Sequence, residues 1–166
     1  MHILINKKYL TYNQYKVKCA VGKRGIGLKK KEGDFITPIG QYKIKYILFR
    51  KDRIKKIQSK FKKIALKKGM GWCNDPKSKK YNKLINIPCS YSYEHLFKKE
   101  NIYDIILVLN YNMNPIKKNK GSAIFIHIAK RNYKKTQGCV AVKKLDLLKI
   151  LREIKINTQV KIERQK

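Results

Sequence analysis

The apolar residues of this chain follow three patterns along its length. Short runs that alternate or are wholly apolar have the length of strands, and they occur between residues 2 and 112 as HILI, YKVKCAVG, QYKIKYILF and YDIILVLNYN. The last of these runs is almost continuously apolar, which suits a strand covered on both faces. Residues 144–155 instead repeat apolar groups at a helical period, and NTQVKIE after them predicts a final strand.

Other segments have weaker patterns. Residues 50–68 place four apolar side chains at helical spacing, but the segment is rich in lysine and has no clear cap. SYEHLFKK predicts a short helix, whereas GMGWCNDPKSKKYN and MNPIKKNKG have the glycine, proline and asparagine content of loops. TPIG, at residues 37–40, predicts a turn because Pro fixes φ and Gly frees it.

Two apolar stretches near the end of the chain each contain one ionisable side chain. In SAIFIHIA the alternation sends the isoleucines to one face and His127 to the other. KRNYKKTQG has the length and polarity of a hairpin loop, and in GCVAV the valines lie on one side and Cys139 on the other. If the two strands pair across this loop, His127 and Cys139 share one face, where directly opposed Cβ atoms lie about 5 Å apart.

A cysteine and a histidine on one face can act as a nucleophile and its base. A thiol reacts as its thiolate, and a nearby imidazole can take the proton. Gly138 lets the chain turn sharply before Cys139 and lets a substrate carbonyl approach main-chain N–H donors. The alternative is a buried cysteine beside a hydrogen-bonded core histidine, since cysteine is among the most buried residue types.

The large positive charge of the chain is weaker evidence for a nucleic-acid partner than its magnitude suggests. A formal net charge of +32 is typical of proteins with polyanionic partners. However, the 36 lysines are spread through every segment and there are only 6 arginines, the residue better suited to bidentate phosphate and base contacts. We therefore expect no specific nucleic-acid recognition.

Length and cysteine content limit the remaining possibilities. The 166 residues fit one domain, residues 1–166, which can bury a core without disulfide or metal staples. The longest apolar run near the N-terminus covers residues 3–5, so no signal peptide is visible, and no window has the roughly 18 apolar residues of a membrane span. The four cysteines form no CxxC pair, so we expect no metal site, and no obligatory disulfide framework if Cys139 is a free thiol.

The ordered motifs of the chain resemble a known family. TPIG, GWCNDPKSKKYN, GSAIFIHIA and TQGCVAV are similar to the catalytic domain of YkuD-type L,D-transpeptidases, and most similar to a short, single-domain proteobacterial branch with L,D-1,3-transpeptidase-like members. The resemblance covers nearly the whole chain. It implies a mainly β fold with a few short helices, a mixed-sheet β-sandwich. It also implies extended structure rather than a helix at residues 50–68, where related chains are rich in proline.

The resemblance implies an acyltransferase that uses no cofactor and no metal. In this interpretation Cys139 attacks a carbonyl of a peptidoglycan stem peptide and forms a thioester, an amine of a second stem resolves it, and His127 carries the proton. The substrate contacts that we expect come from Gly138, Val140, Lys130, Arg131, Trp72 and Tyr81. A packing role for Trp72 and a purely structural role for Tyr81, Asp75 and Asn82 remain the alternatives. His95 is expected on the surface of a lysine-rich helix.

Two positions depart from the pattern of the broad family. Many members follow the histidine with Gly or Ser and follow the Gly-Cys-Val or Gly-Cys-Ile triplet with Arg, whereas this chain has Ile128 and Ala141. His127 must then be oriented by a backbone carbonyl, and Lys130, Arg131 or another base must supply the missing charge. Together with the resemblance to the short branch, whose members join L-alanine to diaminopimelate, these departures favour 1,3 cross-links over 3,3 cross-links.

The family also implies a place and a partner. We expect a monomer in the periplasm or cell envelope that acts on peptidoglycan stem peptides. One alternative is a peptidoglycan carboxypeptidase or endopeptidase of the same fold, in which water resolves the thioester. The alternative from another class is a basic nucleic-acid-binding module, which would show a steep salt dependence and no dependence on Cys139.

Overall fold

The computed structural model describes residues 2–164, and their secondary structure is mostly strand. The strands are β1 (His2–Ile5), β2 (Tyr9–Tyr12), β3 (Tyr15–Ala20), β4 (Ile26–Gly27), β5 (Thr37–Pro38), β6 (Gly40–Phe49), β7 (Lys63–Ala65), β8 (Met70–Cys73), β9 (Leu84–Asn86), β10 (Tyr93–His95), β11 (Ile105–Leu109), β12 (Phe125–Ile128), β13 (Val140–Val142) and β14 (Gln159–Ile162). The helices are α1 (Lys144–Glu153) and the short 3₁₀ turns η1 (Asn101–Tyr103) and η2 (Arg131–Tyr133). The mainly β fold that the resemblance implied is confirmed.

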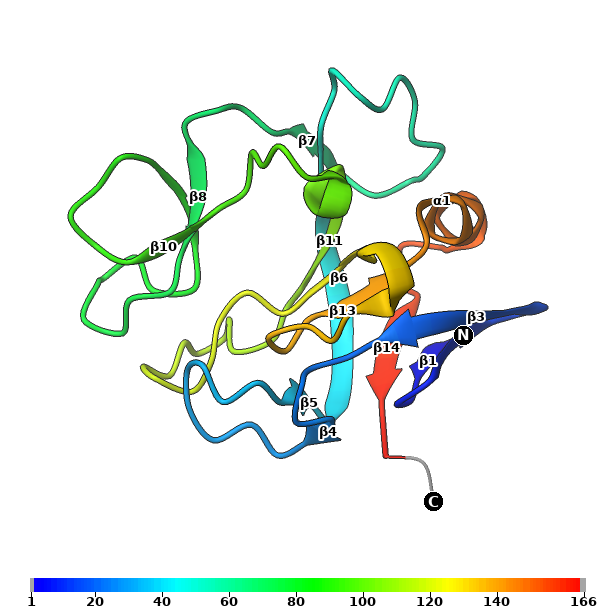
Figure 1. Cartoon of the computed structure of the whole chain (residues 1–166), viewed down its shortest axis with the longest axis horizontal. Coiled ribbons are helices and arrows are strands. Elements are labelled where there is room, and N and C mark those ends of the chain that lie inside the picture. The colour runs from blue at the N-terminus through cyan, green and yellow to red at the C-terminus, as the bar shows by residue number, and fades with distance from the viewer. Residues whose placement is uncertain (1, 165–166) are drawn as a thin grey trace.

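Among the described residues, nine strands form one mixed sheet in the order β11, β12, β13, β3, β2, β1, β14, β6 and β7. The pairs β1–β14, β12–β13 and β6–β7 are parallel, and the other neighbours are antiparallel. Strand β6 also pairs with β11, so the sheet closes on itself. This long strand runs through the middle of the molecule in Figure 1.

Strand β6 closes the sheet because its two halves have different partners. Residues 40–43 pair with β14 and residues 44–49 pair with β11, while Ile47 to Phe49 also pair with β7. The pattern of burial changes at the same point, because residues 40–43 alternate between half-buried and exposed, whereas the buried residues of the strand all lie in the second half. One strand therefore joins the β1–β14 half of the sheet to the half that contains β12 and β13.

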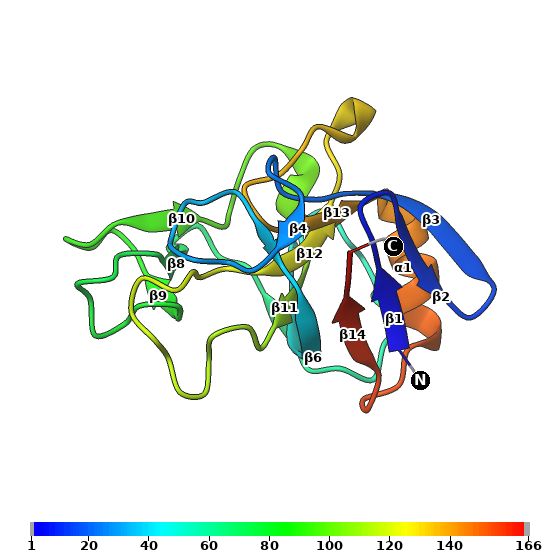
Figure 2. The same cartoon turned by 90° about the horizontal axis from the view of Figure 1, so that it is seen from below.

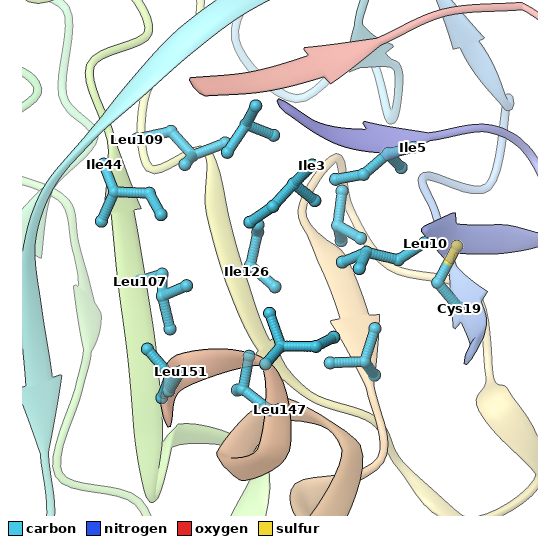
Figure 3. Packing of buried hydrophobic residues seen from close by; sticks show 14 of the residues in the cluster. Ile3, Ile5, Leu10, Cys19, Ile44, Leu107, Leu109, Ile126, Leu147 and Leu151 are labelled. Atoms are coloured by element: carbon cyan, nitrogen blue, oxygen red, sulfur yellow. The ribbon is translucent and has the colours of Figure 1, made fainter. Parts of the chain in front are cut away.

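The larger hydrophobic cluster lies inside the closed sheet, and α1 covers its open side. Figure 3 shows Ile3, Ile5 and Leu10 from the first strands facing Leu107 and Ile126 of β11 and β12, with side chains of α1 beside them. Helix α1 contributes three buried side chains on one stripe, Leu147, Ile150 and Leu151. The helical period predicted for residues 144–155 is thereby confirmed, as are the strands predicted at β1, β3, β6, β11 and β14.

A three-stranded sheet of order β10, β8 and β9 lies at the end of the molecule opposite α1 (Figures 1 and 2). The short helix predicted for residues 92–99 is wrong, and His95 lies on a strand. Tyr93, Glu94 and His95 pair with Cys73, Trp72 and Gly71 of β8. This long-range pairing satisfies the backbone and overrides the local helical preference.

The segment at residues 50–68 contains turns and extended chain, with β7 near its end, and no helix. Ile54, Ile57 and Phe61 are buried in the larger cluster, so the apolar spacing reflects contacts with the core rather than a helical turn. The extended structure that the resemblance favoured is confirmed.

The turn predicted for TPIG is only partly correct, because Thr37–Pro38 forms β5, paired with β4, before Gly40 begins β6 with φ +150°. None of the helices within residues 2–164 has the length and apolar character needed to cross a membrane.

Candidate active site

Strands β12 and β13 are parallel neighbours, so the hairpin predicted for residues 130–138 is wrong. Ile126 pairs with Val140, and His127 pairs with Ala141. The connection carries the chain back to the start of β12 through η2 and a bridge between Gly22 and Thr136. A polar loop of this length can join two strands either as an antiparallel hairpin or as a parallel crossover, so the sequence pattern did not distinguish the two.

Cys139 and His127 nevertheless contact the same smaller hydrophobic cluster. Cys139 directly precedes β13 and packs against the cluster that contains Trp72, Tyr103 and Phe125. The ring of His127 meets the ring of Tyr103 edge-on, with centroids 5.2 Å apart. Because His127 pairs with Ala141, Cys139 lies two residues before the position opposite the histidine. The two side chains therefore share a face in a diagonal rather than a directly opposed arrangement.

Hydrogen bonds to the main chain hold Cys139 in place. Its Sγ donates to the carbonyl oxygen of Ala123 at 3.1 Å. Its own carbonyl oxygen accepts from the hydroxyl of Thr136 at 2.6 Å and from that of Thr37 at 3.5 Å. Gly138 has φ +140°, and a Cβ there would lie 3.1 Å from the carbonyl oxygen of Ile36, so the position before the thiol favours glycine.

A carbonyl of its own strand orients His127. Nδ1 lies 3.0 Å from the carbonyl oxygen of Ile128, and since a carbonyl can only accept, Nδ1 carries the hydrogen in the neutral ring. Nε2 is then the basic atom. Burial lowers the pKa of His127 to about 4, although hydrogen bonding to the Ile128 carbonyl opposes this shift. The backbone carbonyl expected to replace a polar neighbour is thus that of Ile128.

The thiol is also neutral at pH 7. Burial raises the pKa of Cys139 to about 12, and hydrogen bonding to the N–H of Phe125 opposes part of the shift. The charges of Lys29 and Lys98 also lower it, and that of Glu94 raises it. A neutral thiol and a neutral imidazole can react by passing the proton as the sulfur attacks, without a preformed ion pair.

Residues of the GWCNDPKSKKYN motif form hydrogen bonds and ring contacts with the segments that hold Cys139 and His127. Trp72 is 1% exposed, meets Phe125 edge-on with centroids 5.1 Å apart, and donates Nε1–H to Oδ1 of Asn82 at 3.0 Å. The same oxygen accepts the N–H of Ala123 at 3.1 Å. Asn82 also donates to the carbonyl oxygens of residues 111 and 112 at 3.0 and 2.8 Å. Asn82 therefore connects the small sheet to the residue whose carbonyl contacts Cys139.

Tyr81 ties two loops together beside Asn82. It is fully buried, its hydroxyl donates to Glu32, and it accepts the N–H of Gly121 at 3.0 Å. Val140 is likewise fully buried, in β13, and contributes its side chain to the larger cluster.

Lys130 and Arg131 are exposed on the loop between β12 and β13, where they line a groove of about 660 Å³. Ile128, which follows the histidine, lies at the same groove. Lys143 and Lys144, at the start of α1, supply two further positive charges, and Glu100 supplies a negative one. The groove therefore has an apolar wall and a mainly basic rim beside Ile128, and neither His127 nor Cys139 is among the residues that line it.

Three polar residues beside the site had no signal in the sequence. The hydroxyl of Tyr103 donates to Oε1 of Glu94 at 2.9 Å, and Nζ of Lys98 lies 3.0 Å from the same oxygen. Tyr103 also contacts the imidazole of His127. The pairing of β10 with β8 places Glu94 beside the site, and a helix prediction for this segment concealed that position. No three His, Cys, Asp or Glu side chains within residues 2–164 gather as a metal site.

The chain thus combines a closed, mainly β sheet with a buried histidine on β12 and a cysteine directly before the parallel neighbour β13. The family model of the YkuD L,D-transpeptidase catalytic domain matches residues 2–162, and the chain belongs to this family. None of the curated proteins matches the chain.

A solved structure gives an independent comparison of the fold. The chain is similar to the crystal structure of the helical cell shape determining protein Pgp2 (K307A mutant) from Campylobacter jejuni, with a TM-score of 0.51 and 18% sequence identity. The match covers 99% of this chain and 47% of that chain, so the present chain spans about half the length of Pgp2. At this identity the likeness shows a shared fold.

Proposed function

We propose that this chain is an L,D-transpeptidase that cross-links peptidoglycan stem peptides through a thioester on Cys139. The observation that carries the proposal is the position of Cys139, directly before β13 and diagonal to His127 of the parallel neighbour β12, in a chain of the L,D-transpeptidase family. The family places such an enzyme, in our proposal, in the cell envelope. We also propose that the domain acts as a monomer and needs neither a cofactor nor a metal.

The proposed reaction has two balanced half-reactions. Sγ of Cys139 bonds to the donor carbonyl carbon while its proton passes to Nε2 of His127, and the leaving amine takes that proton as the peptide bond breaks. The acceptor amine then attacks the thioester, His127 takes its proton, and the proton returns to the departing sulfur. Main-chain N–H groups at Cys139 and nearby are the proposed donors to the oxyanion, a contribution commonly of about 3 kcal/mol.

The basic groove is the proposed site for substrate carboxylates. Lys130 and Arg131 are exposed at its rim, so they can reach a stem peptide without unfolding any strand. Gly138 and Val140 contribute main-chain atoms beside the thiol. For the buried Trp72 and Tyr81 we propose an indirect role, because each supports a loop that borders the site.

Ala141 supports a preference for 1,3 cross-links. It is 1% exposed, and it lies between His127 and Ala20 in the sheet, so no cation stands where many family members have Arg. A donor cut at L-alanine has its charged diaminopimelate on the leaving side, where the basic groove can bind it. Tandem mass spectrometry of the dimers tests this: a diaminopimelate-to-diaminopimelate bond with release of D-alanine contradicts the 1,3 assignment but leaves Cys139 as nucleophile.

Incubation with purified muropeptides tests the reaction itself, with mass spectrometry of the products. Cross-linked dimers are the expected result, and Cys139→Ala and His127→Ala should each lower their yield at least about 10³-fold. Trimmed monomers would instead indicate a carboxypeptidase or endopeptidase. Unchanged muropeptides would contradict the enzymatic proposal and favour the basic nucleic-acid-binding alternative.

A further inference from the structure

A buried ion pair lies in the glycine-rich segment next to the site. Nζ of Lys29 is 2.6 Å from Oδ1 of Asp34, and each side chain is only 3% exposed. Asp34 also accepts the main-chain N–H groups of residues 30, 31 and 36. Burial alone would raise the pKa of Asp34, but hydrogen bonds from Lys29 and these N–H groups outweigh it and lower the pKa to about 2. The pair is therefore ionised and firmly held.

The ammonium end of the pair faces the residue before the thiol. A Cβ placed on Gly138 would have the carbonyl oxygen of Ile36, Nζ of Lys29 and Cδ1 of Ile124 as its three nearest neighbours, at 3.1, 3.6 and 3.7 Å. No atom of Asp34 is as close. The Lys29 cation, rather than its carboxylate partner, thus adjoins the Gly138–Cys139 peptide.

A second glycine makes room for the same lysine. A Cβ on Gly121 would lie 2.3 Å from Cε of Lys29, and Gly121 has φ +99°. Gly121 is also fixed by Tyr81, whose hydroxyl accepts its N–H at 3.0 Å. The segment before β12 and the segment before β13 therefore both have a glycine at the point where they enclose the lysine.

A buried ion pair gives little net stability, because the cost of removing two charges from water offsets their attraction. Its place beside a thiol points instead to an electrostatic role. A fixed positive charge in a poorly hydrated site stabilises a thiolate and the negative oxygen of a tetrahedral intermediate. The Lys29 charge is also one of the influences that lower the pKa of Cys139.

We propose that Lys29, held by Asp34, is a positioning residue that presents a fixed cation beside Gly138 and stabilises negative charge as it develops at Cys139. This inference rests on the proposed role of Cys139 as the nucleophile. The cation is separate from the basic groove, because Lys29 is not among the residues that line it. Lys29 acts through Cys139 and has no contact with substrate in this account.

Alkylation of Cys139 by a neutral and by an anionic reagent tests the proposal. In a Cys89→Ser background, which removes the exposed thiol, rates for iodoacetamide and iodoacetate are measured at Cys139 across pH by peptide mass spectrometry. The test variant is Lys29→Met with Asp34→Asn, which removes both charges together. The matched control is Lys31→Met, which removes one exposed charge from the same loop.

The double variant should raise the apparent pKa of Cys139 and lower the ratio of the iodoacetate rate to the iodoacetamide rate by about tenfold. In the Lys31→Met control the apparent pKa of Cys139 should not rise, and the ratio of the two rates should stay within about twofold of the parent, because exposed charges are screened. An unchanged ratio in a double variant with a cooperative thermal transition overturns the proposal. If the double variant does not fold, Lys29→Gln, which keeps an amide donor for Asp34, must show the same fall in ratio, and an unchanged ratio there overturns it equally.

Neither reagent uses peptidoglycan, so the two proposals fail separately. A lower ratio in a protein without activity on muropeptides supports the cation at Cys139 while the proposed function fails. An active protein whose ratio does not depend on Lys29 supports the proposed function and excludes this role for the lysine.

Discussion

The thiol of Cys139 donates its hydrogen to the carbonyl oxygen of Ala123, 3.1 Å away. Burial raises the pKa of Cys139 to about 12, so the sulfur keeps its hydrogen in the free protein, and the carbonyl oxygen of Ala123 accepts that hydrogen. In the proposed reaction, the hydrogen must therefore leave Ala123 and reach Nε2 of His127. Asn82 binds the N–H of Ala123, so it controls where that carbonyl lies.

Asn82→Ala should destabilise the protein strongly. The side chain is 1% exposed and makes four hydrogen bonds, and φ at this position is +57°, which asparagine tolerates better than alanine. We expect a loss of about 3 kcal/mol in the free energy of unfolding, measured by urea denaturation. Asn74→Ala, which removes one exposed bond to Ser92, should cost under about 1 kcal/mol. Equal losses in the two variants would contradict the role of Asn82.

Acid should weaken the fold through His127. Burial lowers its pKa from 6.5 to about 4, so between these values the unfolded chain binds a proton that the folded chain does not. Stability is therefore complete above about pH 6.5 and falls as the pH drops toward 4. Between pH 7 and pH 4.5 the free energy of unfolding, measured by urea titration, should fall by about 2 kcal/mol less in His127→Gln than in the parent. His95→Gln, at an exposed position, should match the parent, and an unaltered pH dependence in His127→Gln would show that the imidazole is protonated normally.

The four cysteines should differ in their reactivity toward iodoacetamide. Cys89 is exposed and should be modified first at pH 7, while Cys19 and Cys73 are buried and should react only on unfolding. Modification of Cys139 should accelerate about tenfold per pH unit through pH 9, because burial raises its pKa to about 12. Peptide mass spectrometry gives each rate separately. A Cys139 rate that is already constant below pH 8 would mean that the free protein holds a thiolate.

The excess of basic residues should produce only salt-sensitive contacts with nucleic acid. With 42 basic and 10 acidic side chains, attraction to DNA at low salt is expected for any sequence. Fluorescence anisotropy with two unrelated duplexes should show the same steep loss of affinity toward physiological salt. A preference for one duplex that survives physiological salt would favour a nucleic-acid-binding role.

The local pattern of apolar residues was enough to predict those strands and that helix in which the apolar face is the face that packs against the core. The continuous apolar run at β11 is buried throughout, and the helical period at α1 faces the core. The alternation of residues around His127 also correctly predicted that its side chain lies on the opposite face of the strand from the isoleucines. The parallel pairing of β12 and β13 could not be predicted, because Asn132 and Tyr133 in the connecting loop have positive φ values that the polar sequence does not reveal.

The supporting residues of the site depend on contacts between distant segments. Lys29 is separated by more than one hundred residues from Gly138, which it adjoins, and its proposed role depends on two glycines that leave space for it. Glu94 reaches the site only because β10 pairs with β8. Such relationships follow from the closed sheet as a whole, so no window of the sequence contains them.

Mass spectrometry of the intact protein, after a brief reaction with donor muropeptide and an acid quench, tests the central claim most directly. The account predicts that the chain gains the mass of the donor acyl fragment, that this adduct lies on Cys139, and that hydroxylamine removes it as it does a thioester. Cys139→Ala should gain no mass, while Cys89→Ser should be acylated as fully as the parent. An adduct on another residue, or cross-linking of muropeptides by Cys139→Ala, would contradict the assignment of Cys139 as the nucleophile.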